Sequence, residues 1–237
     1  MIPRLHECRL YDNKILQSKL FRDWMPRTYF ITSKPEAQTI LQFLSYPFIS
    51  KASQGAASSN IRLIKDEKQA KNEIQSAFSF SGIPCHFNLR QKGYLLWQDF
   101  VPGNDFDWRT AIIGKSKRYG KALKRFNRPG TVFASGSHRF EEVNVLTPEV
   151  IEVMNYSLRF AEAFDLTHTA LDFVRDKTGK LLLLENTTIW ERFQKTRNYP
   201  STSIYFEHTD KGWKPVKYHS GTQFELLAKM LFEGCFR

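Results

Sequence analysis

The stretch from residue 47 to residue 78 limits the choice of fold more than any other part of this 237-residue chain. Pro47–Ala52 is predicted to be a buried strand and Ile61–Ile64 its partner, and the small side chains of Ser53–Ser58 form the loop between them. Asp66–Phe78 follows, with apolar side chains at helical spacing. The order of strand, loop, strand and helix indicates one compact unit built from a sheet and a helix.

The rest of the chain also alternates helices and strands. Asp12 is a candidate N-cap of a helix that stops before Pro26, and Ser33–Glu36 has the pattern of a capping box that opens a second helix. Residues 198–219 are aromatic and are expected to be irregular. The other predicted strands are Tyr94–Val101, Trp108–Ile113, Arg118–Phe126, Ala170–Val174 and Lys180–Glu185, and the other predicted helices begin at Thr147 and span Thr222–Phe232.

The chain is strongly basic, with 35 Lys and Arg against 24 Asp and Glu and a net charge of +11. Residues 115–128 concentrate this charge and contain no acid; their cations are Lys115, Lys117, Arg118, Lys121, Lys124, Arg125 and Arg128. A hairpin that lines a cleft for an anionic substrate explains the stretch about as well as a nucleic-acid surface does.

Composition also bears on the compartment. No apolar run approaches the ~20 residues that a membrane span needs, and the N-terminus has no apolar signal-peptide core. The three cysteines, Cys8, Cys85 and Cys235, are odd in number and lack metal-ligand spacing, so we expect free thiols in a reducing cytoplasm. Membrane association is not expected.

Several motifs follow one another in an order that suits a nucleotide site. Lys14 and Lys51 can supply cationic charge to phosphates, and Gly55, Ala56, Ala57 and Ser58 leave the backbone N–H groups accessible. No Gly-Lys-Ser/Thr follows, so the loop is not a Walker A motif. Further along come Gln98-Asp99-Phe100-Val101, Asp107-Trp108-Arg109, Arg125, Leu171-Asp172-Phe173 and Glu185-Asn186-Thr187.

This order resembles the ATP-grasp ligases, above all those that join a carboxylate to an amine, such as the glutathione synthetase and ribosomal-protein glutamate ligase families. The resemblance runs from about Asp12 to Trp190. It implies an α+β fold with two α+β lobes and the nucleotide between antiparallel sheets. The expected parts are a short N-terminal helical segment (1–26) left from an absent or reduced preceding domain, a small lobe with the phosphate-covering loop (27–90), a large lobe with the metal and substrate site (91–190), and a C-terminal extension packed on the large lobe (191–237).

The resemblance also implies roles for single residues. Arg109 and Arg125 match the arginines that hold the substrate carboxylate and the transferred phosphate, and Asp107 matches the acid that meets the ribose. The implied ATP contacts are Lys14, Lys51, Gly55, Ala56, Ser58, Gln98, Asp99, Phe100, Val101 and Asp107. The implied ligands of Mg²⁺, or of Mn²⁺ in its place, are Asp172, Glu185, Asn186 and Thr187.

Two positions depart from the family pattern. Asp99 stands where glutamate is commoner. The metal motif usually ends in glutamate, any residue and asparagine, whereas Glu185-Asn186-Thr187 puts threonine third. Either Asn186 reaches the metal by a one-residue shift, or Thr187 takes the place of the amide.

The implied activity is an ATP-dependent ligase that activates a carboxylate as an acyl phosphate, joins it to an amine and releases ADP and phosphate. The implied partners are ATP, an acidic or carboxylate-bearing substrate and an amine acceptor, which a peptide or protein can provide. Two alternatives remain open: a nucleotidyltransferase or ligase acting on nucleic acid, and a catalytically weakened nucleotide-binding protein. The first is disfavoured because such enzymes use Lys-x-Asp-Gly, and Lys51-Ala52-Ser53-Gln54-Gly55 has no aspartate. The oligomeric state does not follow from the sequence.

Overall fold

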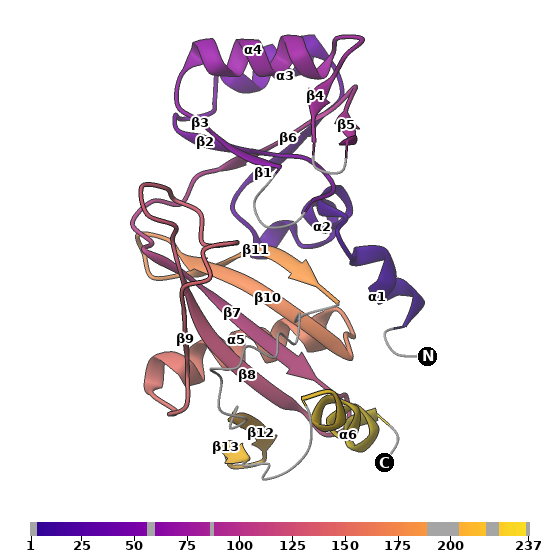
Figure 1. The fold of residues 1–237 in the computed structure, drawn as a ribbon, viewed down its shortest axis with the longest axis vertical. Helices are drawn as coiled ribbons and strands as arrows, with labels where there is room; N and C mark the ends of the chain where they lie inside the picture. Colours follow the sequence, from indigo (N-terminus) through magenta and orange to yellow (C-terminus); the bar gives the residue numbers. More distant parts are fainter. Residues whose placement is uncertain (1–3, 56–59, 86–87, 189–203, 217–222, 236–237) are drawn as a thin grey trace. The chain divides into compact units, whose positions relative to one another are not determined.

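The computed structural model describes residues 4–55, 60–85, 88–188, 204–216 and 223–235. The chain divides into two compact units, and each is built from segments that are distant in the sequence (Figure 1). Unit 1 comprises Met1–Tyr11, Asp105–Phe173 and Asn186–Arg237, and unit 2 comprises Asp12–Asn104 and Val174–Glu185.

Unit 2 is organised around a four-stranded antiparallel sheet in the order β1-β6-β2-β3. A second, two-stranded sheet pairs β4 with β5. The elements of this unit are α2 (Lys14–Leu20), the 3₁₀ helix η1 (Arg22–Trp24), β1 (Thr28–Ile31), α3 (Lys34–Leu41), β2 (Phe48–Lys51), β3 (Ile61–Ile64), α4 (Glu67–Ala77), β4 (Ile83–Pro84), β5 (Arg90–Gln91) and β6 (Leu95–Asp99).

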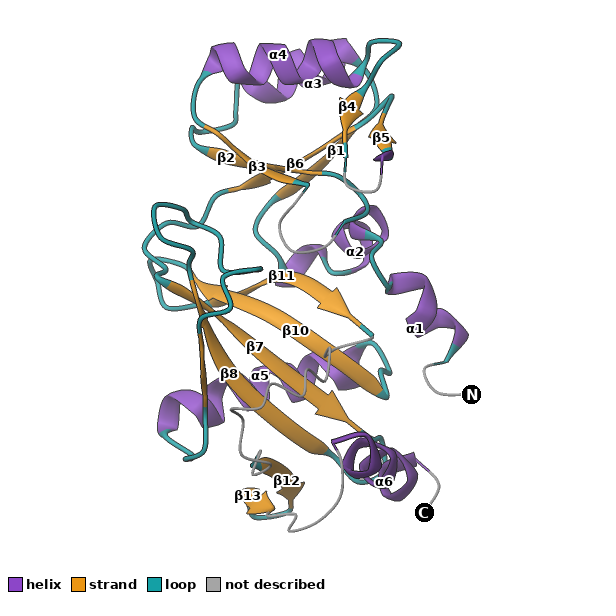
Figure 2. Ribbon diagram, in the orientation of Figure 1, coloured by secondary structure: helices purple, strands orange, loops and turns teal. Residues whose placement is uncertain are grey.

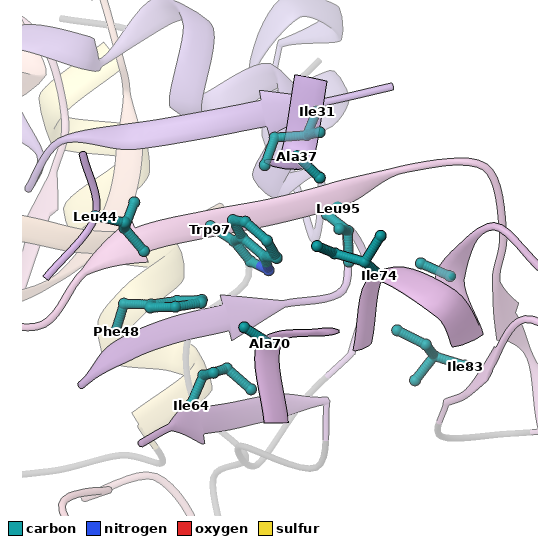
Figure 3. Packing of buried hydrophobic residues seen from close by; sticks show 11 residues of the cluster. Ile31, Ala37, Leu44, Phe48, Ile64, Ala70, Ile74, Ile83, Leu95 and Trp97 are labelled. Carbon is teal, nitrogen blue, oxygen red and sulfur yellow. The ribbon is translucent and has the colours of Figure 1, made fainter. Parts of the chain in front are cut away.

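The core of unit 2 lies between this sheet and the helices α3 and α4, which run along one of its faces (Figure 2). The rings of Phe48 and Trp97 lie 4.9 Å apart between centroids at an angle of 53°, and Ile74 of α4 belongs to the same cluster (Figure 3). Both helices begin at side-chain caps, since Ser33 accepts from the Glu36 amide and Asp66 accepts from the Gln69 amide. These caps and the apolar faces fix where each helix starts and which side it buries.

The opposite face of the four-stranded sheet carries a different set of side chains. Lys51 pairs in register with Leu96, and Ile49 with Gln98. Because side chains alternate along a strand, these four lie on the face turned away from α3 and α4. Gln98 is tied there by a 2.8 Å hydrogen bond from its amide nitrogen to the Thr28 hydroxyl.

Unit 1 is built on a seven-stranded sheet in the order β11-β10-β7-β8-β12-β13, with β9 paired to β8. The unit boundaries divide β10 after Phe173 and β11 after Glu185. The elements are α1 (Leu5–Leu10), β7 (Phe106–Ile113), β8 (Tyr119–Phe126), β9 (Phe140–Glu142), α5 (Pro148–Ala163), β10 (His168–Arg175), β11 (Leu181–Thr187), β12 (Tyr205–Thr209), β13 (Gly212–Val216) and α6 (Gln223–Cys235).

The two faces of the sheet in unit 1 differ in character. Helix α5 covers one face, where the Thr110 and Ser157 hydroxyls lie 2.7 Å apart and the rings of Tyr156 and Phe173 meet edge to face. The other face is apolar at one end, where Met230 of α6 packs with residues such as Ile113. At its other end the same face is charged, and that end carries four of the predicted site residues.

Two sequence-based expectations differ from the observed fold. The boundary expected at residue 90 falls inside unit 2, because β6 pairs with β1 and β2 rather than joining the large sheet. Residues 198–219 were expected to be irregular, yet 205–216 form the β12–β13 hairpin, and β12 pairs with β8 through Phe206 and Glu207. The other residues of that stretch, apart from Ile204, lie outside the described residues.

The N-terminal region also contains structure that periodicity did not reveal. Strand β1 has no counterpart among the predicted elements, and helix α1 lies in the expected N-terminal helical segment but ahead of the helix predicted from Asp12. Asn13, and not Asp12, caps helix α2 by accepting from the Leu16 amide, and Asp12 stands at a positive φ of 48°. The Glu7 carboxylate of α1 is buried and accepts from the Thr167 amide and hydroxyl.

The three cysteines are free, as expected. Among the described residues, none of the helices combines the length and the apolar character that crossing a membrane requires.

Candidate functional site

Unit 2 brings Lys14 and Lys51 to the start of the loop that the sequence singled out. Lys51 is the last residue of β2, and the backbone amide of Lys14, at the start of α2, donates to the Ser53 carbonyl at 3.1 Å. Both side chains are only 6% exposed. Lysine is almost never buried to this degree without partners, so each ammonium must be compensated.

Both lysines have hydrogen-bond partners within unit 2. The Lys51 Nζ donates to the Leu184 carbonyl of β11 at 3.2 Å. The Lys14 Nζ lies 3.0 Å from both Asp12 Oδ1 and Glu185 Oε1 and donates to the Gly55 carbonyl at 3.1 Å. Burial alone lowers the pKa of Lys14, but Glu185 and Asp12 more than offset it, and its pKa is raised above the ordinary value. Lys14 is therefore a stable cation.

The described part of the small-residue loop is fastened at several points. The Gly55 amide donates to both oxygens of Asp12, at 2.9 and 3.0 Å, and Asn60 donates to the Gln54 carbonyl at 2.8 Å. The Ser53 amide donates to the Tyr94 hydroxyl. Gly55 has φ +138°, which suits glycine, and a Cβ there would lie 2.2 Å from the Asn60 side chain. Ala56 and Ser58 lie outside the described residues.

The predicted adenine hinge begins inside β6, which ends at Asp99, and continues into the loop that follows. Gln98 is buried, and the Asp99 carboxylate lies 3.1 Å from Arg27 Nε. The backbone N–H of Asp99 donates to the Arg27 carbonyl, so this donor is already used. Phe100 and Val101 continue as partly exposed loop residues and are not part of a strand.

Four predicted site residues come together on the charged end of the sheet in unit 1. Asp107 pairs in register with Arg125, and Arg109 pairs with Asp172. Arg125 donates to the two oxygens of Asp107 at 2.7 Å each, and its NH2 also lies 2.7 Å from Asp172 Oδ2. Arg109 holds Asp172 in the same bidentate way, at 2.8 and 3.2 Å. Two arginines and two aspartates leave this cluster with no net formal charge.

The two carboxylates of the cluster differ in acidity. Burial raises the pKa of Asp107 to about 6, although Arg125 opposes the shift. Burial also acts on Asp172, but Arg109 and Arg125 together outweigh it and hold its pKa below the ordinary value. Asp172 is thus the more firmly ionised of the two, as an anionic ligand of a cation should be.

The predicted metal motif is divided between the two units. Glu185 belongs to unit 2 and pairs with Lys14, whereas Asn186 and Thr187 belong to unit 1. Asn186 is fully buried, and its amide nitrogen donates to the Thr169 hydroxyl. Among the described residues, no three His, Cys, Asp or Glu side chains form a ready-made metal site. The oxygen donors of Asp172, Glu185, Asn186 and Thr187 are nevertheless of the hard type that Mg²⁺ takes.

The basic stretch is not a free cationic surface, because most of its cations have partners within unit 1. Arg118 is buried and donates to the Gly114 and Leu166 carbonyls, and Lys124 lies over the Phe106 and Trp108 rings, 3.8 Å from Glu149. The remaining ion pairs are Lys115–Asp165, Lys117–Glu207, Lys117–Glu233, Lys121–Glu142 and Arg125–Asp107.

Sequence reasoning missed the place of Asp12 in the site. It considered this residue only as a helix cap, whereas Asn13 takes that role and leaves the Asp12 carboxylate to Lys14 and Gly55. The close spacing of Asp12 and Lys14 is the one signal that could have indicated an ion pair.

Comparison with known proteins gave matches of structure alone. No protein-family model matches the chain, and no curated protein matches it either. Among solved structures, carboxyaminoimidazole ribonucleotide synthase from Aspergillus clavatus complexed with ATP has a TM-score of 0.60 at 10% identity, over 98% of this chain and 54% of that one.

Two further solved structures also match this chain, and they are named for other reactions. D-alanyl-alanine synthetase A from Vibrio cholerae has a TM-score of 0.55 at 19% identity, over 76% of this chain and 56% of that one. The biotin carboxylase domain of 2-oxoglutarate carboxylase from Hydrogenobacter thermophilus, in complex with MgADP and bicarbonate, has a TM-score of 0.56 at 17% identity, over 78% of this chain and 41% of that one.

The chain spans about half the length of these solved structures. At such low sequence identity the matches are evidence for the fold alone. Together with the four-stranded and seven-stranded sheets and their order of elements, they show that this chain has the ATP-grasp fold.

Proposed function

We propose that this chain is an ATP-dependent, ADP-forming ligase that joins a carboxylate to an amine. The observation that carries the proposal is the placement of Lys14 and Lys51, two buried lysines beside the described start of the Gly55 loop, in a chain with the ATP-grasp fold. Transfer of a phosphoryl group depends mainly on positioned cations and backbone donors, and these residues supply both.

In this proposal unit 2 binds the nucleotide. Lys14, Lys51 and the loop containing Gly55, Ala56 and Ser58 hold the phosphates. The segment Gln98-Asp99-Phe100-Val101 contacts adenine. The face of the sheet that bears Lys51 and Gln98 supports this role, because helices α3 and α4 occupy only the other face. From unit 1 we assign Asp107 to the ribose hydroxyls.

The charged cluster of unit 1 serves the reacting groups. Arg109 and Arg125 present planar guanidinium groups, which match two oxygens of a carboxylate or a phosphate at once. A substrate carboxylate oxygen attacks the γ-phosphorus of ATP, the bond to the β-γ bridging oxygen breaks, and ADP leaves. The amine nitrogen then attacks the acyl carbon, inorganic phosphate leaves, and the nitrogen loses a proton to give the amide.

Mg²⁺, or Mn²⁺ in its place, would be held by Asp172, Glu185 and either Asn186 or Thr187, and when bound it would neutralise the charge of the phosphates. The bidentate contacts of Arg109 keep Asp172 ionised and oriented until then. The biotin carboxylase domain that matches this chain is in complex with MgADP, which supports Mg²⁺ as the cofactor.

The substrates we propose are a carboxylate-bearing, acidic molecule and an amine acceptor, including the amine of a peptide or protein. The ion pairs of the basic stretch argue against a nucleic-acid substrate, since a phosphate backbone would have to displace acids that are already in contact. The three free cysteines suit the cytoplasm as the site of the reaction.

Product analysis tests the proposal. The full chain is incubated with Mg²⁺, ATP and pools of amino acids and dicarboxylates, and adenine nucleotides and phosphate are measured together. ADP and phosphate formed in equal amounts, only when both a carboxylate and an amine are present, is the expected result. AMP with pyrophosphate would point to a nucleotidyltransferase, and ATP binding without any turnover would point to a catalytically weakened protein.

A further inference from the structure

The donors that the proposed function assigns to phosphate in unit 2 already hold an anion. The Asp12 carboxylate accepts from the Gly55 amide through both oxygens, at 2.9 and 3.0 Å, and from the Lys14 Nζ at 3.0 Å. A backbone N–H in a glycine loop together with a lysine ammonium is the combination of donors that a phosphate group would use.

The ammonium of Lys14 has no donor left for a further ligand. An ammonium group has three N–H donors, and three acceptors lie within reach of Lys14 Nζ: Asp12 Oδ1 at 3.0 Å, the Gly55 carbonyl at 3.1 Å and Glu185 Oε1 at 3.0 Å. A phosphate oxygen can therefore bind Lys14 only if one of these acceptors leaves.

Asp12 is the acceptor best placed to leave. Glu185 is part of strand β11, and the Gly55 carbonyl belongs to the loop itself. Asp12 is held by neither a helix nor a strand, because α1 ends at Leu10 and α2 begins at Lys14, and one third of its side chain is exposed. Of the three acceptors it is also the one that binds both Lys14 and the Gly55 amide, so a phosphate that took its place would satisfy both donors.

We propose that Asp12 is a resident anion that occupies the phosphate position in the empty protein and is displaced by the nucleotide. The inference rests on the proposed function and adds a positioning residue to it. While the nucleotide is absent, Asp12 pairs with Lys14 and holds the described part of the loop at Gly55. When phosphate binds, it competes with the Asp12 carboxylate for the same donors. The strength of the Asp12 contacts therefore sets the observed affinity for phosphate.

The test uses isothermal titration of the full chain with sodium tripolyphosphate and, separately, with MgATP. Asp12→Asn keeps the shape of the side chain and removes its charge. It should bind tripolyphosphate roughly 10-fold more tightly than the wild type, the worth of one charge-assisted contact. Asp12→Glu keeps the charge and should stay within about 2-fold of the wild type. Asp23→Asn is the matched control, because it removes an exposed carboxylate of the same unit and leaves affinity unchanged.

A second measurement does not depend on variants. The carboxyl ¹³C resonance of Asp12 should shift when tripolyphosphate is added to the wild-type protein, because the carboxylate loses its donors. No shift on saturation, or a folded Asp12→Asn variant that binds tripolyphosphate no better or more weakly, overturns the inference and makes Asp12 a fixed support of the loop. If the wild-type chain binds neither tripolyphosphate nor MgATP, the proposed function itself fails.

Discussion

Arg109 binds both carboxylate oxygens of Asp172 across the β7–β10 pair, with Nε 2.8 Å from Oδ1 and Nη2 3.2 Å from Oδ2. Arg125 adds a contact of 2.7 Å to the same carboxylate. Asp172 is therefore a structural member of the sheet of unit 1 as well as the candidate metal ligand, and the two roles make separate predictions.

Asp172→Asn should destabilise the protein far more than Glu185→Gln. The first change leaves two largely buried guanidinium groups with one carboxylate fewer, at a cost of about 3 kcal/mol. The second should cost less than about 1 kcal/mol, because Glu185 is 29% exposed and Lys14 keeps Asp12. Urea unfolding followed by tryptophan fluorescence measures both. Equal losses in the two variants would contradict the structural role of Asp172.

His168 should make the protein sensitive to mild acid. Burial lowers its pKa to about 4 from the ordinary 6.5, so the unfolded chain takes up the proton first as the pH falls. The contribution of neutral His168 to the free energy of unfolding is fully present above pH 6.5. As the pH falls towards 4 this contribution is lost, by up to roughly 3 kcal/mol. Asp107 acts in the opposite direction, because its raised pKa favours the folded state at low pH and that contribution is lost as the pH rises through about 6.

A comparison of wild type with His168→Asn separates the two effects, because both proteins contain Asp107. As the pH falls from 6.5 to 4, the free energy of unfolding of the variant should rise relative to that of the wild type by up to roughly 3 kcal/mol, because only the opposing Asp107 contribution remains. The two curves should run parallel above pH 7. Identical slopes below pH 6.5 would show that His168 is not held neutral in the folded protein.

Gly55→Ala should be more damaging than Gly93→Ala. Both glycines have positive φ, of 138° and 72°, but a Cβ at Gly55 would lie 2.2 Å from the Asn60 side chain, whereas a Cβ at Gly93 would meet nothing within 4 Å. Gly93→Ala should therefore show only the backbone cost of about 1 kcal/mol. Gly55→Ala should exceed it and also weaken ATP binding. The account of the loop would be wrong if the two variants matched in both stability and ATP affinity.

Much of the secondary structure follows from local sequence. The caps Ser33, Asp66 and Thr147 accept hydrogen bonds from the amides at the helix starts that the pattern predicted. Strands 48–51 and 61–64 pair as expected on either side of the loop. Helix caps and the alternation of side chains along a strand depend on residues only a few positions apart, so they can be identified from the sequence alone.

The partners of strands and charges depend on distant residues and could not be found in this way. Strand β1 has only four residues, and its pairing with β6 joins positions about seventy residues apart, such as Thr28 and Gln98. Likewise Lys117 meets Glu233 on α6. The charge of a stretch that is purely basic in sequence is therefore largely neutralised by acids from other parts of the chain. Counting charges along the sequence overstated the electrostatic field of this stretch.

The basic stretch should consequently contribute to folding. Lys117→Glu would place a third carboxylate beside Glu207 and Glu233, and we expect a loss of roughly 1 kcal/mol in the free energy of unfolding. Lys177→Glu, in the exposed turn between β10 and β11, makes the same change of charge and should cost less than about 0.5 kcal/mol. Chemical denaturation at low and moderate salt measures the loss in the two variants. Equal losses would show that Lys117 behaves as an ordinary solvated surface lysine.

In the proposed function, unit 2 binds the phosphates of ATP through Lys51. Calorimetric titration of MgATP into wild type, Lys51→Ala and Lys71→Ala tests it most directly, since Lys71 is an exposed lysine of the same unit. Lys51→Ala should raise the Kd roughly 10- to 100-fold, the worth of a charge-assisted contact, while Lys71→Ala should leave it unchanged. A folded Lys51→Ala protein that binds MgATP as tightly as the wild type would contradict it.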